Sequence, residues 1–340
     1  MRLPSLFTSK RLGIDLGTSN CLVWSSGEGV VLSEPSVVAV DSVTGKVVAV
    51  GSQAHEMLGR TGTNLVAQKP LKDGVVADFL VCEAMIKHFL DRVLGSSRLA
   101  RPEVMICVPS GITQVERRAV LEATLSAGAK TAYLIEQPLA AALGAKLPID
   151  AAFGSMVIDI GGGVTGVAVV SLGGIVVASS ARVGGNKIDE AIITYLRRTH
   201  NLVIGERMAE EIKLKIGSAV TSGPRKLMEA RGRDAVLGLP KAVTIDSNEV
   251  TEAMQPALAS IIACIKSVLE QTPPELASDI IDRGIVMTGG ASQLRMLDRM
   301  IANATNVPAH VAEDPMQCVV YGTGIALENI GVWRRAVLSA

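Results

Sequence analysis

Residues 157–171 read VIDIGGGVTGVAVVS, and residues 12–25 read LGIDLGTSNCLVWS. Each stretch is a β-branched run that ends in Ile-Asp, followed by a glycine-rich turn and a second apolar run. This pattern predicts a β-hairpin whose loop carries an acid and small residues. The two aspartates, Asp15 and Asp159, lie nearly half of the 340-residue chain apart. A repeat on this scale indicates duplication, so we expect two related α/β domains that face one another.

The rest of the chain alternates strand-like and helix-like stretches, which is typical of layered α/β folds. Residues 113–127 predict a helix that opens with a capping box of Thr113 and Glu116. Residues 316–330 predict a final helix interrupted by Gly-Thr-Gly, and residues 221–240 a surface loop or small hairpin. The other predicted elements are strands at 104–109, 132–136 and 284–288 and helices at 138–145, 188–198, 206–216, 248–269 and 294–302.

The composition narrows the class of protein. The chain is 48% hydrophobic, which favours a globular fold over disorder. Lys+Arg and Asp+Glu balance at 33 each, and aromatic residues make up 3%, so we expect no nucleic-acid partner. The five cysteines are scattered and never form a C-x-x-C pair, which argues against a disulfide framework or a zinc site. No apolar run reaches about 18 residues, so we expect no membrane-spanning helix.

Three glycine turns carry the predicted chemistry: residues 15–20, 159–163 and 288–292. Glycine turns cradle phosphates because backbone N–H groups approach the anion without obstruction by a Cβ. Two of the turns begin with an aspartate, and a carboxylate can hold Mg²⁺ through its waters. The chain lacks the G-x-x-x-x-G-K-[ST] pattern of P-loop proteins. We therefore expect two hairpins that grip a metal–triphosphate from opposite sides.

Several motifs resemble those of a known family. The phosphate hairpins DLGTSN and DIGGGVT, the connecting segments IEQPLAAALGA and GTGIAL, and MTGGAS are similar to those of the actin–Hsp70–sugar-kinase superfamily. Stretches such as SEPSVVAV, KDGVVADF, CVPSGITQVERRA, GGNKIDEAIITYLRR and PPELASDI extend the resemblance to the MreB family of bacterial actins over residues 10–330. It implies an α/β, actin-like (ribonuclease H-like) fold of two domains around a central ATP cleft, each with a large and a small subdomain.

The resemblance also implies an organisation and a function. Domain I is expected at 12–144 plus 315–340, and domain II at 145–314 with its small subdomain at about 185–250. A family member would bind ATP with Mg²⁺ and form homopolymers of paired protofilaments in the cytoplasm. These filaments would lie at the inner face of the cytoplasmic membrane, where they and the rod-complex membrane proteins organise cell-wall synthesis and determine rod shape.

The resemblance assigns site residues position by position. Asp15 and Asp159 would support Mg²⁺, and Gln137, Glu136, Asp159 and Thr165 would form the catalytic group. An ordinary solvated helix face stays the alternative for Glu210 and Lys213. The expected nucleotide contacts are Asp15, Gly17, Thr18, Ser19 and Asn20 in the first hairpin, Gly161, Gly162, Gly163 and Val164 in the second, Glu210, Glu211, Ile212 and Lys213 beside the sugar and base, and Gly289, Gly290, Ala291 and Ser292 around the adenosine.

Three positions in two segments depart from the family pattern: Gln137, Val164 and Gly166. The family usually has a glutamate before the proline of its connecting segment, where this chain has Gln137, and Thr-Thr-Glu where this chain has Val164-Thr165-Gly166. Glutamine can orient a water but cannot accept its proton, and loss of a general base slows catalysis by about 10²–10⁴-fold. We therefore expect a weak ATPase. The alternative is that Glu136 reaches the water and both changes are harmless.

Residues 1–11 predict an amphipathic membrane-contact segment. Leu3, Leu6 and Phe7 fall on one helical face, followed by Lys10 and Arg11. A frayed tail is the alternative. Loop 94–102, the other membrane-inserting position of the family, offers only Leu99 beside Ala100, which is little apolar area.

Other classes fit the sequence less well. A small-molecule kinase on the same fold would need a catalytic aspartate near a sugar pocket, and none stands out. A chaperone ATPase would need a substrate-binding domain after the nucleotide domain, and we do not expect one because the sequence ends at Ala340. A degenerate paralogue that binds ATP and co-assembles with an active filament protein stays open because of Gln137 and Val164.

Overall fold

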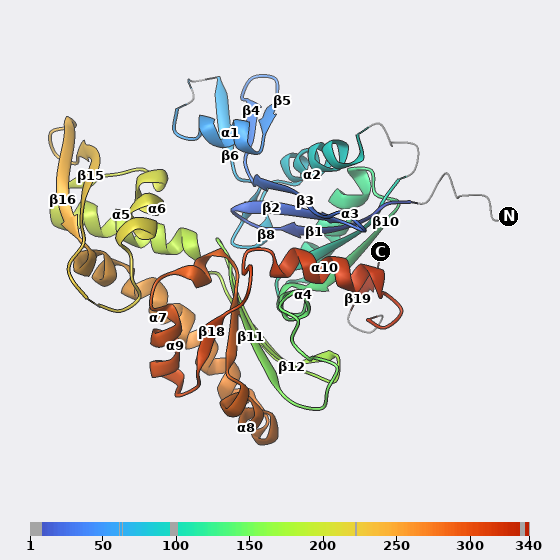
Figure 1. Ribbon diagram of the computed structural model, residues 1–340. Coiled ribbons are helices and arrows are strands. Elements are labelled where there is room, and N and C mark those ends of the chain that lie inside the picture. Colours follow the sequence, from blue (N-terminus) through green and yellow to red (C-terminus); the bar gives the residue numbers. More distant parts are fainter. Residues whose placement is uncertain are drawn as a thin grey trace.

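The computed structural model describes residues 9–60, 62, 64–95, 101–221, 223–333 and 337–339. Leu3, Leu6, Phe7, Leu99 and Ala100, on which the membrane predictions depend, lie outside these residues. Two central sheets organise the fold (Figure 1), and we use domain I for the part built on the first sheet and domain II for the part built on the second.

The sheet of domain I has six strands in the order β19-β10-β9-β1-β2-β3. Its first two strands form the predicted hairpin, since β1 and β2 pair antiparallel, and β1 also pairs parallel with β9. The strands are β1 (Arg11–Leu16), β2 (Asn20–Ser25), β3 (Gly29–Pro35), β9 (Glu103–Val108), β10 (Thr131–Glu136) and β19 (Val337–Ser339).

The sheet of domain II repeats this arrangement with five strands in the order β13-β12-β11-β17-β18. The second predicted hairpin is β11–β12, and β11 pairs parallel with β17 as β1 does with β9. The duplication expected from the two Ile-Asp-glycine stretches is therefore present in the strand pairing. The strands are β11 (Ser155–Ile160), β12 (Thr165–Ser171), β13 (Gly174–Ala181), β17 (Ile285–Thr288) and β18 (Ala309–Val311).

A smaller unit accompanies each sheet, and both units lie at the upper end of the molecule in Figure 1. The unit of domain II contains the hairpin β15–β16, which begins later and is longer than the hairpin expected within 221–240. The first unit comprises β4 (Val38–Asp41), β5 (Val47–Val50), α1 (Ser52–Met57) and β6 (Leu65–Gln68), followed by β7 (Leu71–Lys72) and β8 (Val75–Val76); the second comprises α5 (Gly185–His200), β14 (Leu202–Val203), α6 (Glu206–Ile216), β15 (Leu227–Asp234) and β16 (Pro240–Asp246).

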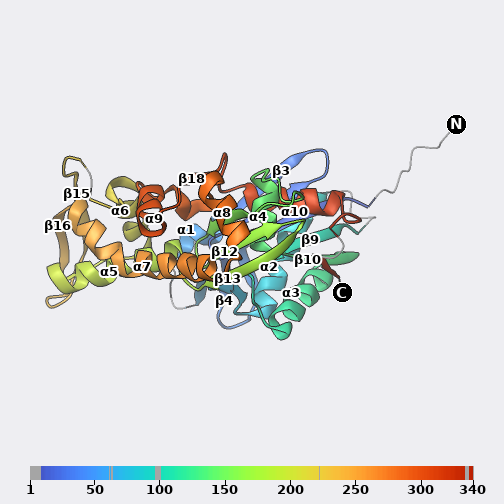
Figure 2. The ribbon, with the colours of Figure 1, turned by 90° about the horizontal axis from the view of Figure 1, so that it is seen from below.

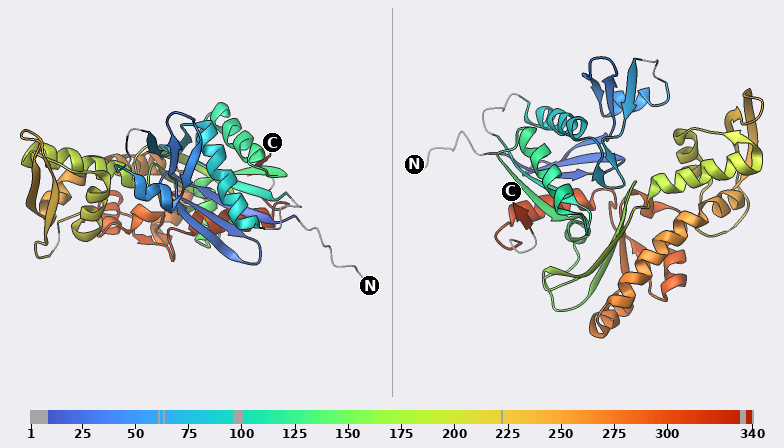
Figure 3. Two further views of the ribbon diagram at one scale, coloured as in Figure 1. Left: turned by 90° about the horizontal axis from the view of Figure 1, so that it is seen from above. Right: turned by 180° about the vertical axis from the view of Figure 1, so that it is seen from behind.

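Helix α7 (Ser247–Gln271) is the core helix of domain II and runs beside α5 (Figures 2 and 3). Asp246 and Glu249 form a capping box at its start, and it ends before Pro273. In the described residues it is the one helix long and apolar enough to cross a membrane. Its apolar side chains, including Met254, Leu258, Ile261 and Ile265, are instead buried in the core of domain II.

The remaining helices cover the sheets. The predicted capping box of Thr113 and Glu116 opens α3. Helix α9 begins at Leu297 rather than at the expected Leu294, because residues 290–293 form a short 3₁₀ turn and Met296 adopts a left-handed conformation. The helices are α2 (Phe79–Leu94), α3 (Gln114–Ser126), α4 (Gln137–Gly144), α8 (Pro274–Arg283), α9 (Leu297–Thr305) and α10 (Cys318–Glu328).

The expected interruption of the last helix is wrong. Helix α10 runs without a break through Gly322 and Gly324. A Cβ at Gly322 would lie 1.8 Å from the carbonyl oxygen of Ala140 in α4, and one at Gly324 would lie 2.5 Å from the Trp24 ring. The two glycines therefore allow close packing of α10 on its neighbours and do not end the helix.

Candidate functional site

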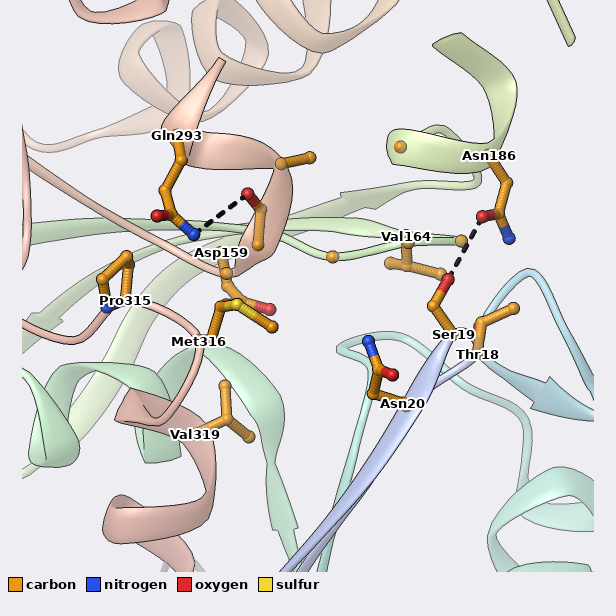
Figure 4. A pocket seen from close by; sticks show the side chains of 18 of the residues that line it. Thr18, Ser19, Asn20, Asp159, Val164, Asn186, Gln293, Pro315, Met316 and Val319 are labelled. Atoms are coloured by element: carbon orange, nitrogen blue, oxygen red, sulfur yellow. Dashed lines mark hydrogen bonds between the residues drawn. The ribbon is translucent and has the colours of Figure 1, made fainter. Parts of the chain in front are cut away.

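A cavity of about 400 Å³ lies between the two domains, and both glycine hairpins line it (Figure 4). Its walls come from the ends of β1 and β11, the first turns of α4 and α5, one face of α6 and the glycine turn after β17. Strands of both sheets thus deliver polar residues to one place. The sequence-predicted residues that line it are Asp15, Gly17, Thr18, Ser19, Asn20, Gln137, Asp159, Gly161, Gly162, Gly163, Val164, Glu210, Lys213, Gly289, Gly290 and Ala291.

The two hairpin turns touch each other. A Cβ at Gly162 would lie 2.0 Å from Ser19 Oγ, and a Cβ at Gly163 would lie 2.6 Å from Thr18 Oγ1. Only glycine fits at such an approach, which leaves the backbone of the second turn bare toward the cavity. Ser19 Oγ donates a hydrogen bond to Asn186 Oδ1 at the start of α5 over 3.1 Å, as Figure 4 shows. The hairpin of domain I is thereby tied to domain II.

The two hairpin aspartates are buried and influence each other. Burial raises the pKa of Asp15 to about 6, although the Cys107 thiol donates a hydrogen bond to its Oδ1 over 3.1 Å. Burial, and then the charge of Asp15, raises the pKa of Asp159 to about 7. Thr288 Oγ1 and Gln137 Nε2 each donate to Asp159 over 2.8 Å and partly offset this rise. Among the described residues, no cation contributes to the pKa of either carboxyl, and a pair of buried carboxylates is suited to a divalent metal ion.

The protein alone provides an incomplete metal site. In the part of the chain that the structure describes, no group of three or more His, Cys, Asp or Glu residues could hold a metal ion. Mg²⁺ is commonly held by one or two carboxylates together with substrate phosphates and water. The bare glycine turns beside Asp15 and Asp159 could place phosphate oxygens where the remaining ligands are needed.

The α6 wall of the cavity carries a buried ion pair. Lys213 Nζ lies 2.9 Å from both carboxylate oxygens of Asp189 and also donates to the carbonyl oxygen of Gly185. Burial raises the pKa of Asp189 to about 6, and the Lys213 charge opposes this rise. Glu210 lines the cavity one turn before Lys213. Lys213 and Glu210 thus lie on the side of α6 that lines the cavity.

Three predicted nucleotide contacts lie elsewhere. Glu211 bonds to Lys215 on the outer side of α6. Ile212 is fully buried in the core of domain II. Ser292 is buried and donates to the carbonyl oxygen of Gly289, so it shapes the glycine turn from behind. None of the three lines the cavity.

The four predicted catalytic residues do not all line the cavity. Gln137, the first residue of α4, lines the cavity, as does Asp159. Glu136 directly precedes α4 and does not line it. Thr165 is fully buried, and its hydroxyl donates to the carbonyl oxygen of Val183 over 2.7 Å. Of these four residues, Gln137 and Asp159 therefore line the cavity, and Glu136 and Thr165 do not.

Further lining residues were missed from the sequence. Asn186 follows Gly184-Gly185 at the start of α5, and these glycines were the signal that could have marked it. The apolar lining residues, such as Met316 and Val319, carried no signal in the sequence because their pattern is that of ordinary core residues. Further lining residues come from the segment after β17 and from the start of α10 with the residues before it: Gln293, Leu294, Arg295, Pro315, Met316 and Val319.

Comparisons with known proteins agree on one family. The family described as MreB/Mbl protein matches residues 9–335. The cell shape-determining protein MreB of Escherichia coli K12 is 51% identical over 327 residues, which cover 95% of this chain and 94% of the relative. The cell shape-determining protein Mbl of Bacillus subtilis strain 168 is 48% identical over 322 residues, covering 95% and 97%.

Solved structures give the same result. MreB5 of Spiroplasma citri bound to ADP superposes with a TM-score of 0.90 at 37% identity, covering 95% of this chain and 97% of that one. The same protein bound to AMPPNP superposes equally well. A MamK double helical filament subunit has a TM-score of 0.79 at 23% identity, covering 95% and 99%, which is a likeness of fold.

Proposed function

This chain belongs to the MreB/Mbl family, and we propose that it is a bacterial actin that binds ATP between its glycine hairpins and polymerises into filaments that determine cell shape. The predicted actin-like fold is confirmed by its likeness to MreB5. The relatives named as cell shape-determining proteins match nearly the whole chain, which supports the same role here.

One observation carries the nucleotide proposal: two glycine turns from opposite domains meet beside two buried carboxylates. Backbone N–H groups of the turns would hold the phosphates, and Asp15 and Asp159 would hold Mg²⁺ through its waters. Lys213 and Glu210 would border the sugar, with the Gly289 turn beside the base. The nucleotides bound by MreB5, ADP and AMPPNP, support an adenine nucleotide as the ligand.

We propose slow hydrolysis for this site. Bound Mg²⁺ would neutralise charge on the phosphates, and the chain's own part is to position the attacking water. Gln137 has its amide nitrogen committed to Asp159, which leaves its amide oxygen to orient a water without taking a proton. Val164 is buried on the cavity wall and offers no hydroxyl to that water.

Gln137 and Val164 also favour a second candidate function. A chain that holds ATP and hydrolyses it slowly could serve as a regulatory subunit in the filament of another actin homologue. The pure protein separates the two functions, because only the first requires assembly without a second homologue.

The proposed membrane contact is made by residues 1–11. We propose that Leu3, Leu6 and Phe7 insert weakly into the inner face of the cytoplasmic membrane, and that many copies in a filament make the contact stable. Deletion of residues 2–9 should abolish co-sedimentation of filaments with anionic liposomes. Replacing the three apolar residues by serine separates their loss from a change of length, and retained co-sedimentation would contradict the proposal. Rod-complex membrane proteins are the proposed partners there.

Simultaneous light scattering and phosphate release with Mg-ATP tests the main proposal. Assembly with slow release is the expected result. Assembly with brisk release would keep the filament and remove the proposed effect of Gln137 and Val164. Tight ATP binding without assembly would favour the regulatory subunit. Asp15→Asn should weaken ATP binding in the same assay.

A further inference from the structure

An ion pair joins the two domains beside the cavity. Lys69, directly after β6 in domain I, places its Nζ 2.9 Å from Oε2 of Glu206, the first residue of α6 in domain II. The Lys69 charge also reaches Asp189, where it lowers the carboxyl pKa, and Asp189 holds the cavity residue Lys213. One lysine of domain I therefore faces two carboxylates of domain II.

The segment after Lys69 forms part of the cavity wall. It continues into the hairpin β7–β8, whose turn residues Asp73 and Gly74 have positive φ angles of 51° and 80°. Gly74 N–H donates to Thr18 Oγ1 over 3.1 Å, and a Cβ at Gly74 would lie 2.6 Å from Cγ2 of Val164. The turn thus lies against both phosphate hairpins, five residues from the ion pair.

A second pair of opposite charges, Asp73 and Lys187, lies near the same turn. The Asp73 carboxylate is near enough to raise the pKa of Lys187, which lies in the first turn of α5, although Lys187 bonds first to Glu190. Asp73 lies in the β7–β8 turn of domain I and Lys187 lies in domain II, so the two charges attract across the domains without forming a direct ion pair. The direct charge contact of this segment with domain II is the Lys69–Glu206 ion pair.

We propose that Lys69 and Glu206 form a latch that holds the β7–β8 turn over the cavity and slows release of the bound nucleotide. The latch rests on the proposed nucleotide binding. Release requires the turn and α6 to separate, and the ion pair must break for them to do so. The contact is weak enough for this, because the Glu206 side chain is 72% exposed and salt screens such pairs.

Charge-reversal variants test the latch through the rate at which etheno-ATP leaves the protein when chased with excess ATP and Mg²⁺. Glu206→Lys replaces the attraction by a solvent-screened repulsion between two lysines, and we expect release about twofold to fivefold faster. Lys69→Glu adds repulsion from Glu206 and Asp189, so we expect release about threefold to tenfold faster. Added salt should speed release from the unaltered protein and not from Lys69→Glu.

Two further variants complete the design. The double variant K69E/E206K restores one attraction and should bring release back toward the unaltered rate. Lys72→Glu is the matched control, since Lys72 lies in the same hairpin and makes no ion pair among the described residues; we expect it to leave release unchanged. Thermal unfolding of each variant checks that the exposed changes leave the fold intact.

The outcomes separate the latch from the nucleotide proposal. Saturable etheno-ATP binding with equal release from Lys69→Glu and Lys72→Glu would overturn the latch alone. The latch would also be overturned if Lys69→Glu and Glu206→Lys each speed release and the double variant K69E/E206K is no slower than they are. The two charges would then act separately. Absence of saturable binding by the unaltered protein would overturn the latch and the proposed function together.

Discussion

Gln137 Nε2 donates a hydrogen bond to Asp159 Oδ2 over 2.8 Å, which links the start of α4 to the end of β11 at the cavity. This bond partly offsets the rise that burial causes in the pKa of Asp159. A glutamate at position 137, the residue that the family resemblance led us to expect there, would place a third carboxylate at this point and could not donate when ionised. The Gln137 amide thus stabilises the ionised form of Asp159, but unlike a glutamate it cannot accept a proton from a water.

The double reversion Gln137→Glu, Val164→Thr should accelerate hydrolysis. A carboxylate can accept the proton of the attacking water, and general-base assistance contributes about 10²–10⁴-fold, so we expect phosphate release at least about tenfold faster. The measurement is single-turnover phosphate release with Mg-ATP. Gln137→Ala is the control, since it removes the water-orienting amide and should slow release further. Equal rates for the double reversion and the unaltered protein would show that the two residues do not limit hydrolysis.

The nucleotide-free protein should lose stability as pH rises from about 4 to about 7. The folded-state pKa of Asp159 is raised to about 7 from an ordinary 3.8, so the folded chain binds the proton more tightly across that window. The contribution is complete below the unfolded pKa and is lost as pH rises through the folded one. Asp15, with its pKa raised to about 6, acts in the same direction.

Asp159→Asn removes the part of this pH dependence that comes from Asp159. At pH 8 it should raise the free energy of unfolding without nucleotide by on the order of 2 kcal/mol, since each pKa unit corresponds to about 1.4 kcal/mol. It should weaken Mg-ATP binding at the same time. Urea unfolding at pH 5 and pH 8 measures the effect, with the exposed Asp282→Asn as control. If Asp159→Asn and the unaltered protein lose the same stability between pH 5 and pH 8, the pH dependence does not come from Asp159.

The local patterns predicted the parts of the fold that depend on neighbours in sequence. The hairpins around Asp15 and Asp159 follow from short β-branched apolar runs joined by glycine turns, and the capping box at Thr113 follows from two residues three apart. The role of Gly322 could not be predicted in this way. Its reason lies in the carbonyl of Ala140 on another helix, and a glycine reads the same whether it ends a helix or lets a neighbour approach.

The same distinction applies to the site. Asp15, Asp159 and the glycine turns were found because phosphate and metal binding need those residue types in a local order. Met316 was missed because it lines the cavity only through the packing of distant segments. Ser292 was placed in the site by resemblance, but its hydroxyl points back to its own turn.

Gly322→Ala tests the close packing of α10 on α4. The added methyl would meet the Ala140 carbonyl oxygen at 1.8 Å, and backbone cannot yield as a side chain can. We expect a loss of about 3 kcal/mol in the free energy of unfolding, at the upper end for overpacking. Gly331→Ala is the control, because a Cβ there meets nothing within 4 Å. Equal stability of the two variants in urea unfolding would mean that α10 can shift away from α4.

Lys213→Met should destabilise the protein more at high pH than at low pH. It leaves Asp189, whose side chain is 12% exposed, without its cation, and breaking a buried pair costs about 3–5 kcal/mol. The folded-state pKa of Asp189, already about 6, should rise further, so the penalty grows as pH rises and shrinks when the carboxyl is protonated. Urea unfolding at pH 5 and pH 8 measures the difference.

Two further variants test whether the effect of Lys213→Met comes from the Lys213–Asp189 ion pair. Lys215→Met removes an exposed lysine bonded to Glu211 on the same helix and should change stability by less than about 0.5 kcal/mol. The double variant D189N/K213M removes both buried charges and should recover most of the stability at pH 8, because the remaining cost is one of hydrogen bonding and packing. If the double variant is no more stable than Lys213→Met, Lys213 acts through its bond to the Gly185 carbonyl, and the ion pair with Asp189 is not what stabilises this wall of the cavity.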